Sequence, residues 1–250
     1  GVRVLVQKTA GTGSGFTDAE YAEAGAEMME TPEDVAKEVD VLVKVKEPIE
    51  PEYHLLELMK GKTLYTYLHL SGVVKSLTDK LLETEITGIA YETIHDADGK
   101  LPCLAPMSEV AGVLAVQYGA EYLQKKYKGR GTTLGHITNA DDPHTVVIGG
   151  GVVGTTSAKT AAGMGGKVTI FDINPARVEE LKKEMHEYLG DNLYKNISVL
   201  KSEPGTFERA VKDADLLIGG VLVAGTKAPM VVPESMVKAM KDGSVIVDVA

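Results

Sequence analysis

Short apolar runs alternate with amphipathic stretches along most of this chain. The apolar runs have the length of single strands and the stretches between them have helical spacing, so the pattern predicts an α/β fold with parallel sheets. In the first half we expect strands at 2–7, 40–45, 63–67 and 86–91. We expect helices that begin near 17 and 31 and helices at 52–59 and 73–83.

Two of these helix starts carry clear capping signals. Thr17-Asp-Ala-Glu20 has the spacing of a capping box, in which a threonine hydroxyl and a glutamate three residues later satisfy each other's backbone N–H groups. Thr31-Pro32 places an N-cap residue before a proline in the first helical turn.

The middle of the chain suggests a domain boundary. A long helix is expected at 108–126, and its apolar positions fit a helical period only loosely, which predicts burial on several faces. A linker-like stretch rich in Gly and Asp follows at 128–143. We therefore divide the chain into a first domain at 1–106 and a second at 107–250, which is entered through the long connecting helix.

The second domain has a sharper pattern than the first. Strands are expected at 145–149, 167–171, 197–200, 215–218 and 244–248. The helices expected between them lie near 152–164, 175–188, 205–213 and 233–240. Five such strands make up most of a doubly wound dinucleotide-binding sheet.

A glycine-rich turn follows the first strand of that sheet. Gly149-Gly-Gly-Val-Val-Gly154 has the G-x-G-x-x-G spacing, with a strand before it and an Ala-rich helix after it. Gly149 permits the tight turn, Gly151 permits close approach of a pyrophosphate, and Gly154 permits close helix packing. The helix N-terminus offers free N–H groups to the phosphates. We therefore predict that Gly149, Gly151, Val152, Val153 and Gly154 contact the cofactor.

An acidic residue ends the next strand. Asp172 stands 23 residues after Gly149, where a carboxylate would accept hydrogen bonds from the adenosine ribose. A 2′-phosphate there would meet a like charge, at a penalty of up to ~4 kcal/mol at 4 Å, so NAD is favoured over NADP. Arg177 is close enough to soften this preference and joins the predicted cofactor site. The alternative is an ordinary β-turn-α unit in which Asp172 is a helix cap.

Composition narrows the possible partners. Lys and Arg number 26 against 36 Asp and Glu, and the resulting net charge of −10 argues against nucleic acid and anionic lipid as partners. A single cysteine favours a reducing, cytoplasmic setting. The histidines have no metal-ligand spacing, so no metal is expected. The cluster Gly11-Thr-Gly-Ser-Gly15 is followed by acidic residues and is interpreted as a flexible loop.

Several motifs in order along the chain resemble the alanine dehydrogenase family, which belongs to a superfamily with the transhydrogenase α-subunit. They are Leu42-Val-Lys-Val-Lys-Glu-Pro48, Thr66-Tyr-Leu-His-Leu70, Ile89-Ala-Tyr-Glu-Thr93, Ala105-Pro-Met-Ser-Glu-Val-Ala-Gly112, Ala214-Asp-Leu-Leu-Ile-Gly219, Gly225-Thr-Lys-Ala-Pro229 and Gly243-Ser-Val-Ile-Val-Asp-Val-Ala250. The resemblance implies two Rossmann-like doubly wound parallel-sheet domains that flank a cleft. It also implies that 1–106 is the substrate domain, and that the protein assembles as a homo-hexamer.

The resemblance implies NAD-dependent oxidative deamination of L-alanine to pyruvate and ammonia. Lys46 would bind and polarise the substrate, and His69 would be the general acid and base. Ser108, Asp172 and the loop that contains Val221 and Leu222 would contact NAD. The family's substrate-binding arginine, its catalytic aspartate and a returning C-terminal segment have no counterpart in the sequence, so we expect a fragment with both domains incomplete.

Other interpretations stay open at this stage. From residue type alone, Lys46 would be a solvated lysine, His69 a packed or surface histidine, and Ser108 a helix N-cap. The chain could also be a transhydrogenase-like NAD(H)-binding subunit, or a non-catalytic NAD-binding module whose first half is an interaction surface.

Overall fold

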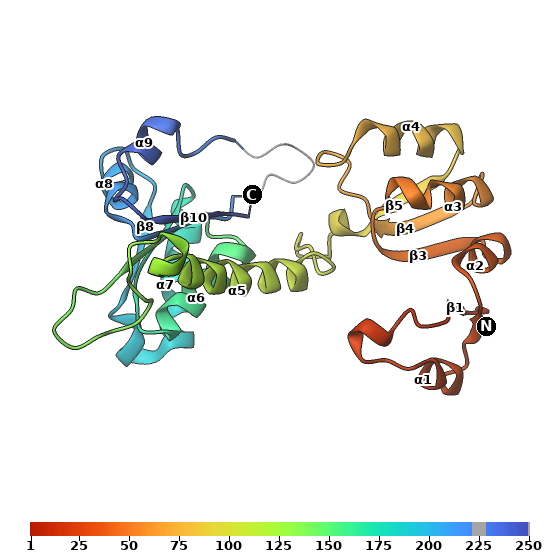
Figure 1. The fold of residues 1–250 in the computed structure, drawn as a ribbon, viewed down its shortest axis with the longest axis horizontal. Coiled ribbons are helices and arrows are strands. Elements are labelled where there is room, and N and C mark those ends of the chain that lie inside the picture. Colours follow the sequence, from red (N-terminus) through yellow and green to blue (C-terminus); the bar gives the residue numbers. More distant parts are fainter. Residues whose placement is uncertain (222–228, 250) are drawn as a thin grey trace. The chain divides into compact units, whose positions relative to one another are not determined.

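The computed structural model describes residues 1–221 and 229–249, and it divides the chain into two compact units, Gly1–Cys103 and Leu104–Ala250 (Figure 1). Both units are α/β and every strand pair described in them is parallel, which confirms the predicted fold class. In the structure the boundary between the two compact units falls between Cys103 and Leu104. The predicted domain boundary at 106/107 and the role of each domain stay predictions.

The described strands of the first unit form two separate parallel sheets. One pairs β1 with β2, and the other has the order β3-β4-β5. In chain order the elements are β1 (Leu5–Gln7), η1 (Thr12–Ser14), α1 (Asp18–Glu23), β2 (Glu27–Met29), α2 (Pro32–Glu38), β3 (Val41–Lys46), η2 (Glu50–Glu52), α3 (Tyr53–Leu58), β4 (Thr63–Tyr67), α4 (Lys75–Glu83), β5 (Thr87–Ala90) and η3 (Tyr91–Thr93).

The predicted helix starts of this unit are confirmed. Thr17 and Glu20 form a complete capping box at the start of α1, and Thr31 caps α2 with Pro32 in its first turn. Two strand predictions need correction. The expected strand at 2–7 forms only over Leu5–Gln7, because its parallel partner β2 is equally short. β2 itself was missed, since three residues are too few to display a period.

The two faces of the β3-β4-β5 sheet differ. Consecutive parallel strands joined by right-handed crossovers carry their helices on one face, and α3 and α4 both cover the same face (Figure 1). Leu56, Leu64 and Leu77 form the core there. On the opposite face the side chains of Val43 and Val45 are exposed.

The second unit contains a five-stranded sheet of order β10-β9-β6-β7-β8. The chain starts in the middle, moves outward on one side to β8, and then returns to β9 and β10 on the other side, which is the predicted doubly wound topology. Its elements are α5 (Ala105–Tyr122), η4 (Lys125–Tyr127), β6 (His144–Ile148), α6 (Val152–Gly163), β7 (Lys167–Asp172), α7 (Pro175–Tyr194), β8 (Ile197–Lys201), α8 (Thr206–Asp213), β9 (Leu216–Gly219), α9 (Glu234–Lys238) and β10 (Val245–Asp248).

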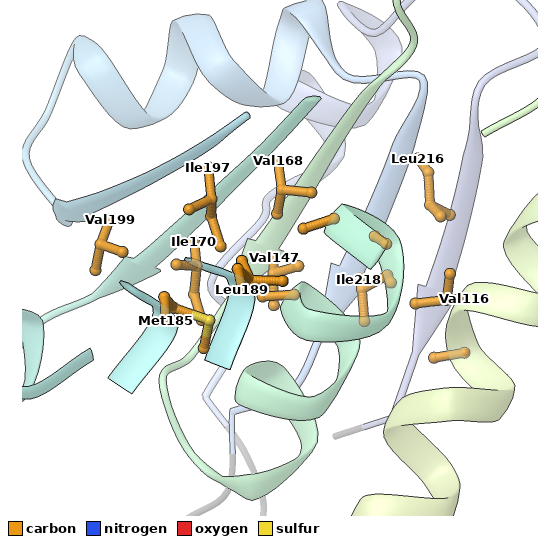
Figure 2. Close-up of a cluster of buried hydrophobic side chains, with 14 of the residues drawn as sticks. Val116, Val147, Val168, Ile170, Met185, Leu189, Ile197, Val199, Leu216 and Ile218 are labelled. Carbon is orange, nitrogen blue, oxygen red and sulfur yellow. The ribbon is translucent and has the colours of Figure 1, made fainter. Parts of the chain in front are cut away.

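Both faces of this sheet are covered, as parallel sheets require. Alternate residues of β6 point to opposite cores. Val147 packs with residues of α5, α6 and α7 (Figure 2), and Val146 packs with residues of α8 and α9 on the other face. The near-continuous apolar runs of these strands follow from this burial on two faces.

Three predictions about the second unit are corrected. α5 runs from Ala105 to Tyr122 rather than over 108–126, and it is buried along one stripe instead of several faces. That stripe consists of Gly112, Ala115, Val116 and Gly119, whose small side chains weaken the helical signal while they allow α6 to approach closely. The linker-like stretch 128–143 is packed in its first part, since Arg130 Nε lies 2.7 Å from Asp215 Oδ1 and Leu134 is buried. α7 extends beyond 188 to Tyr194, past a break at Gly190, where φ is 62°.

Among the described helices, none combines the length and the apolar character needed to cross a lipid bilayer.

Candidate active site

The glycine-rich turn lies at the carboxyl end of β6, the central strand of the second unit. Gly149 has a φ of 97°, and its N–H donates to the Phe171 carbonyl at 2.8 Å. A side chain at Gly149 would lie 2.9 Å from the Gly220 carbonyl oxygen. The left-handed backbone and this close contact both require glycine here.

The other two fingerprint glycines have different environments. A Cβ at Gly154 would overlap the Gly149 carbonyl oxygen, so this glycine lets the first turn of α6 close on the preceding loop. Gly151 is the N-cap of α6, and nothing lies within 4 Å of a Cβ placed on it. The turn is therefore tightly packed at Gly154 and open at Gly151, beside the N–H groups of Val152 and Val153 in the first turn of α6.

Gly150 is a contact position of the turn that the sequence interpretation missed. Its N–H donates to Asp172 Oδ2 at 2.8 Å, and its carbonyl accepts from Arg177 Nε at 2.9 Å. A Cβ there would lie 2.5 Å from Leu181 Cδ1 and 2.8 Å from Asp172 Oδ2. The unbroken run of three glycines was the available signal, because the fingerprint itself requires only the first and the third.

Asp172 and Arg177 are both engaged with the turn. The other Asp172 oxygen, Oδ1, accepts from the Asn174 N–H at 2.8 Å, and Asn174 rather than Asp172 caps α7. Arg177 also donates to Thr155 Oγ1 at 3.2 Å, and its guanidinium pairs with Glu180 and Glu184. Arg177 therefore braces the turn. Each Asp172 oxygen has a second lone pair and can still accept a hydroxyl.

The loop after β9 runs beside the turn. The Gly220 N–H donates to the Ile148 carbonyl at 2.9 Å, and a Cβ at Gly220 would lie 3.2 Å from Val153 Cγ1. Val221 packs against the core that contains Ile148. Leu222 and residues 225–228 of the predicted motif lie outside the described residues.

Ser108 lies inside the first turn of α5 and is not an N-cap, because the helix begins at Ala105 after the N-cap Leu104. Gly112 follows four residues later on the same helix face. Its carbonyl accepts from Ser157 Oγ at 3.0 Å, and a Cβ there would lie 2.7 Å from the Val153 carbonyl oxygen. This face of α5 therefore packs against the start of α6, at the glycine-rich turn.

In the first unit, Lys46 and His69 both contact one aromatic ring. Lys46 Nζ is 4.2 Å from the centroid of the Tyr67 ring, and the His69 ring stacks on the same tyrosine at 5.7 Å between centroids and 24° between planes. Lys46 and His69 are both exposed. The structure thus brings together the two side chains that the sequence singled out 23 residues apart.

A β-bulge accounts for the position of Lys46. The register of β3 against β4 shifts between Val43 and Lys46, so Lys46 rather than Val45 pairs with Tyr67. Because paired residues point to the same face of a sheet, the extra residue turns the lysine toward the open face. The Lys46 carbonyl accepts from Thr66 Oγ1 at 2.8 Å, and the Val45 carbonyl accepts from the Tyr91 hydroxyl.

Lys46 has a carboxylate beside it. Glu47 Oε2 lies 3.2 Å from Lys46 Nζ. Burial alone would raise the pKa of Glu47, but hydrogen bonds from its own backbone N–H and from Lys46 hold that pKa below its ordinary value. Burial raises the pKa of Tyr67, with help from the charges of Glu92 and Glu47 and against that of Lys46. Tyr67 therefore stays a neutral phenol at working pH.

The backbone at His69 is strained. Its φ of 44° lies in the left-handed region, which costs an L-residue roughly 1–2 kcal/mol. A Cβ at Gly72 would overlap Nε2 and Cδ2 of the imidazole, so the ring packs directly on the Gly72 α-carbon. Strain of this kind at a polar side chain is frequent at functional sites. Within the described residues, no group of three or more His, Cys, Asp or Glu side chains is arranged to hold a metal ion.

Comparison with known proteins shows the family. The profile described as "Alanine dehydrogenase/PNT, N-terminal domain" matches residues 1–111, and "Alanine dehydrogenase/PNT, C-terminal domain" matches residues 115–250. The chain is 47% identical over its whole length to alanine dehydrogenases of Methanococcus maripaludis and Mycolicibacterium smegmatis, and it spans 64% of the length of each.

Solved structures give the same result. An L-alanine dehydrogenase superposes with a TM-score of 0.83 at 44% identity, over 99% of this chain and 65% of the other. A transhydrogenase from Sinorhizobium meliloti gives 0.74 at 25% identity, over 98% of this chain and 68% of the other. With both profiles matched in order and the glycine-rich turn in place, the chain belongs to the alanine dehydrogenase/PNT family.

Proposed function

We propose that the protein oxidises L-alanine with NAD: L-alanine, NAD⁺ and water give pyruvate, ammonium, NADH and a proton. The observation that carries this proposal is the convergence of an ammonium and an imidazole, from Lys46 and His69, on one Tyr67 ring. The residue types suit the reaction, because a cation fixes an α-carboxylate and an imidazole exchanges protons near neutral pH. Greater similarity to alanine dehydrogenase than to transhydrogenase supports this choice over the NAD(H)-binding-subunit alternative.

NAD fits the turn in the second unit. Gly151 leaves open space at the N-terminus of α6, where a pyrophosphate would meet backbone N–H groups. Asp172, at the carboxyl end of β7, would accept the adenosine ribose hydroxyls and disfavour a 2′-phosphate. Val152, Val153, Ser108 and Val221 would line the remaining contacts. When bound, NAD supplies the hydride acceptor.

The chain's own residues would then perform substrate binding and proton transfer. Lys46, held in place by the bulge in β3, would bind the substrate carboxylate or the carbonyl of pyruvate. His69 would accept the proton released as water adds to the imine of alanine, and would return a proton as ammonia departs. The exposure of both side chains leaves them accessible to a small substrate.

Alanine-dependent formation of NADH by the full-length protein is the direct test. We expect His69→Ala to lower kcat by about 10² to 10⁴-fold, the usual contribution of a general acid–base group. Lys46→Ala should raise the KM for alanine while the Kd for NADH stays the same. Lys60→Ala, a change of an exposed lysine just after α3 in the same unit, is the control. The absence of alanine-dependent activity in the full-length wild-type protein would rule out the proposal.

Assembly and location follow from the resemblance and the sequence. A homo-hexamer is the predicted assembly, and light scattering coupled to size-exclusion chromatography of the full-length protein tests it. A cytoplasmic location stays a prediction from the single cysteine.

A further inference from the structure

Glu92 is a buried carboxylate that the proposed proton transfers do not use. It lies in η3, directly after β5, and only 8% of its surface is exposed. Its Oε1 accepts from the His69 N–H at 2.7 Å, and its Oε2 accepts from the Leu68 N–H at 3.3 Å. A carboxylate from the end of one strand therefore holds two consecutive N–H groups at the end of the neighbouring strand.

The Glu92 contacts are made to a strained part of the backbone. His69 has positive φ without being glycine, and such a conformation persists only when the surroundings impose it. Successive N–H groups directed at one anion are a known way to fix a chain in this region. The Gly72 N–H also donates to the His69 carbonyl at 2.8 Å and closes the turn from the other side.

We propose that Glu92 is a positioning residue for His69: its carboxylate fixes the left-handed backbone at Leu68–His69 and thereby holds the imidazole between the Tyr67 ring and Gly72. This inference rests on the proposed function for its catalytic consequence. Glu92 is not a proton carrier in this arrangement, because both its oxygens bind backbone N–H groups and the side chain is buried. Its neighbour Tyr91 binds the Val45 carbonyl in the bulge before Lys46, so η3 supports both members of the pair.

Glu92→Gln and Glu92→Ala in the full-length protein test the proposal. The glutamine keeps one acceptor and loses the other, so we expect kcat for alanine to fall about fivefold. Glu92→Ala loses both acceptors, and we expect its kcat to fall about 50-fold, as for a misplaced catalytic group. The Kd for NADH should change less than twofold. Glu85→Gln, an exposed glutamate of the same unit whose φ is also positive (55°), is the control and should behave as wild type.

A second readout does not depend on activity. The imidazole proton resonances of His69, assigned with His69→Gln, should shift and broaden in Glu92→Gln relative to wild type. If Glu92 only stabilises the fold, the folded variants will melt at lower temperature but keep wild-type kcat and wild-type His69 resonances, and the proposal is then wrong. If Glu92→Ala does not fold, the isosteric Glu92→Gln decides.

The two proposals fail in different ways. A wild-type protein without alanine-dependent activity contradicts the proposed function, and the resonance comparison still decides whether Glu92 positions His69. If wild type is active and Glu92→Gln has the same kcat and the same His69 resonances, only the positioning role is contradicted.

Discussion

The two candidate sites, one in each unit, are built in different ways. The turn in the second unit is made of backbone: glycines without room for a side chain, and the free N–H groups at the start of α6. The pair in the first unit is made of exposed side chains, on a bulge and on a strained turn, and these are held by Tyr67, Glu92 and Tyr91. A backbone site is specified by local sequence, whereas a side-chain site depends on contacts made across strands.

The largest expected effect separates a packed glycine of the turn from an unpacked one. In Gly154→Ala the new methyl group would overlap the Gly149 carbonyl oxygen, which is backbone and cannot move away cheaply. We expect a loss of about 3 kcal/mol in the free energy of unfolding, and loss of NADH binding, measured by chemical denaturation and calorimetric titration. Gly163→Ala, at the other end of α6 with nothing within 4 Å, is the control. Equal behaviour of the two variants would show that the turn is not tightly built.

Lowering the pH should destabilise the second unit through His144 but not the first unit through His54. Burial lowers the pKa of His144, at the start of β6, from 6.5 to about 4, with further lowering by Lys167 and Lys241. The unfolded chain therefore binds this proton more tightly than the folded chain does. The free energy of unfolding is fully retained above pH 6.5 and falls by roughly 3 kcal/mol as pH falls toward 4. Denaturant unfolding of wild type between pH 7 and pH 5 should show a steeper loss than His144→Gln.

The exposed His54 of the first unit should respond in the opposite direction. Its hydrogen bond to Glu33 raises its pKa. That stabilisation is present below the ordinary pKa and is lost as pH rises through the raised value. His54→Gln should therefore lose at least as much unfolding free energy between pH 7 and pH 5 as wild type does. If wild type and His144→Gln lose equal stability on acidification, the buried neutral state of His144 is contradicted.

A smaller effect is expected at Gly72. In Gly72→Ala the methyl group would overlap the His69 imidazole, which can rotate away because it is the end of a side chain. The fold should survive while kcat for alanine falls about tenfold, since the ring leaves its place against Tyr67. Gly13→Ala, in open space in the same unit, is the matched control. Steady-state kinetics with unchanged kcat would mean that the ring position does not matter.

The smallest expected effect concerns the Tyr67 ring. Tyr67→Leu removes the cation–π contact with Lys46 and the stacking with His69, and exposed contacts of this type contribute about 0.5–1 kcal/mol. We expect the KM for alanine to rise about two- to fivefold. Tyr67→Phe keeps the ring and should match wild type. If both variants have the same raised KM, the hydroxyl rather than the ring is responsible.

Much of the fold could be predicted from the sequence because its signals are local. The capping box at Thr17, the alternation of strands and helices from β6 to β10 and the glycine-rich turn each depend on residues close in sequence. The errors occur where packing between elements overrides the local pattern. The small residues of α5 conceal a single buried stripe, and β2 is too short to show a period.

The sequence by itself determined the fold class and the position of the glycine-rich turn, and its resemblance to a known family made Lys46 and His69 candidates. Only the tertiary structure decided how the last two meet. The bulge that turns Lys46 to the open face, the Glu92 carboxylate on the His69 backbone and the Gly150 contact with Asp172 join residues 21 to 23 positions apart. Spacing along a chain carries no information about such contacts, because they form only when separate strands of a parallel sheet bring their carboxyl ends to one edge.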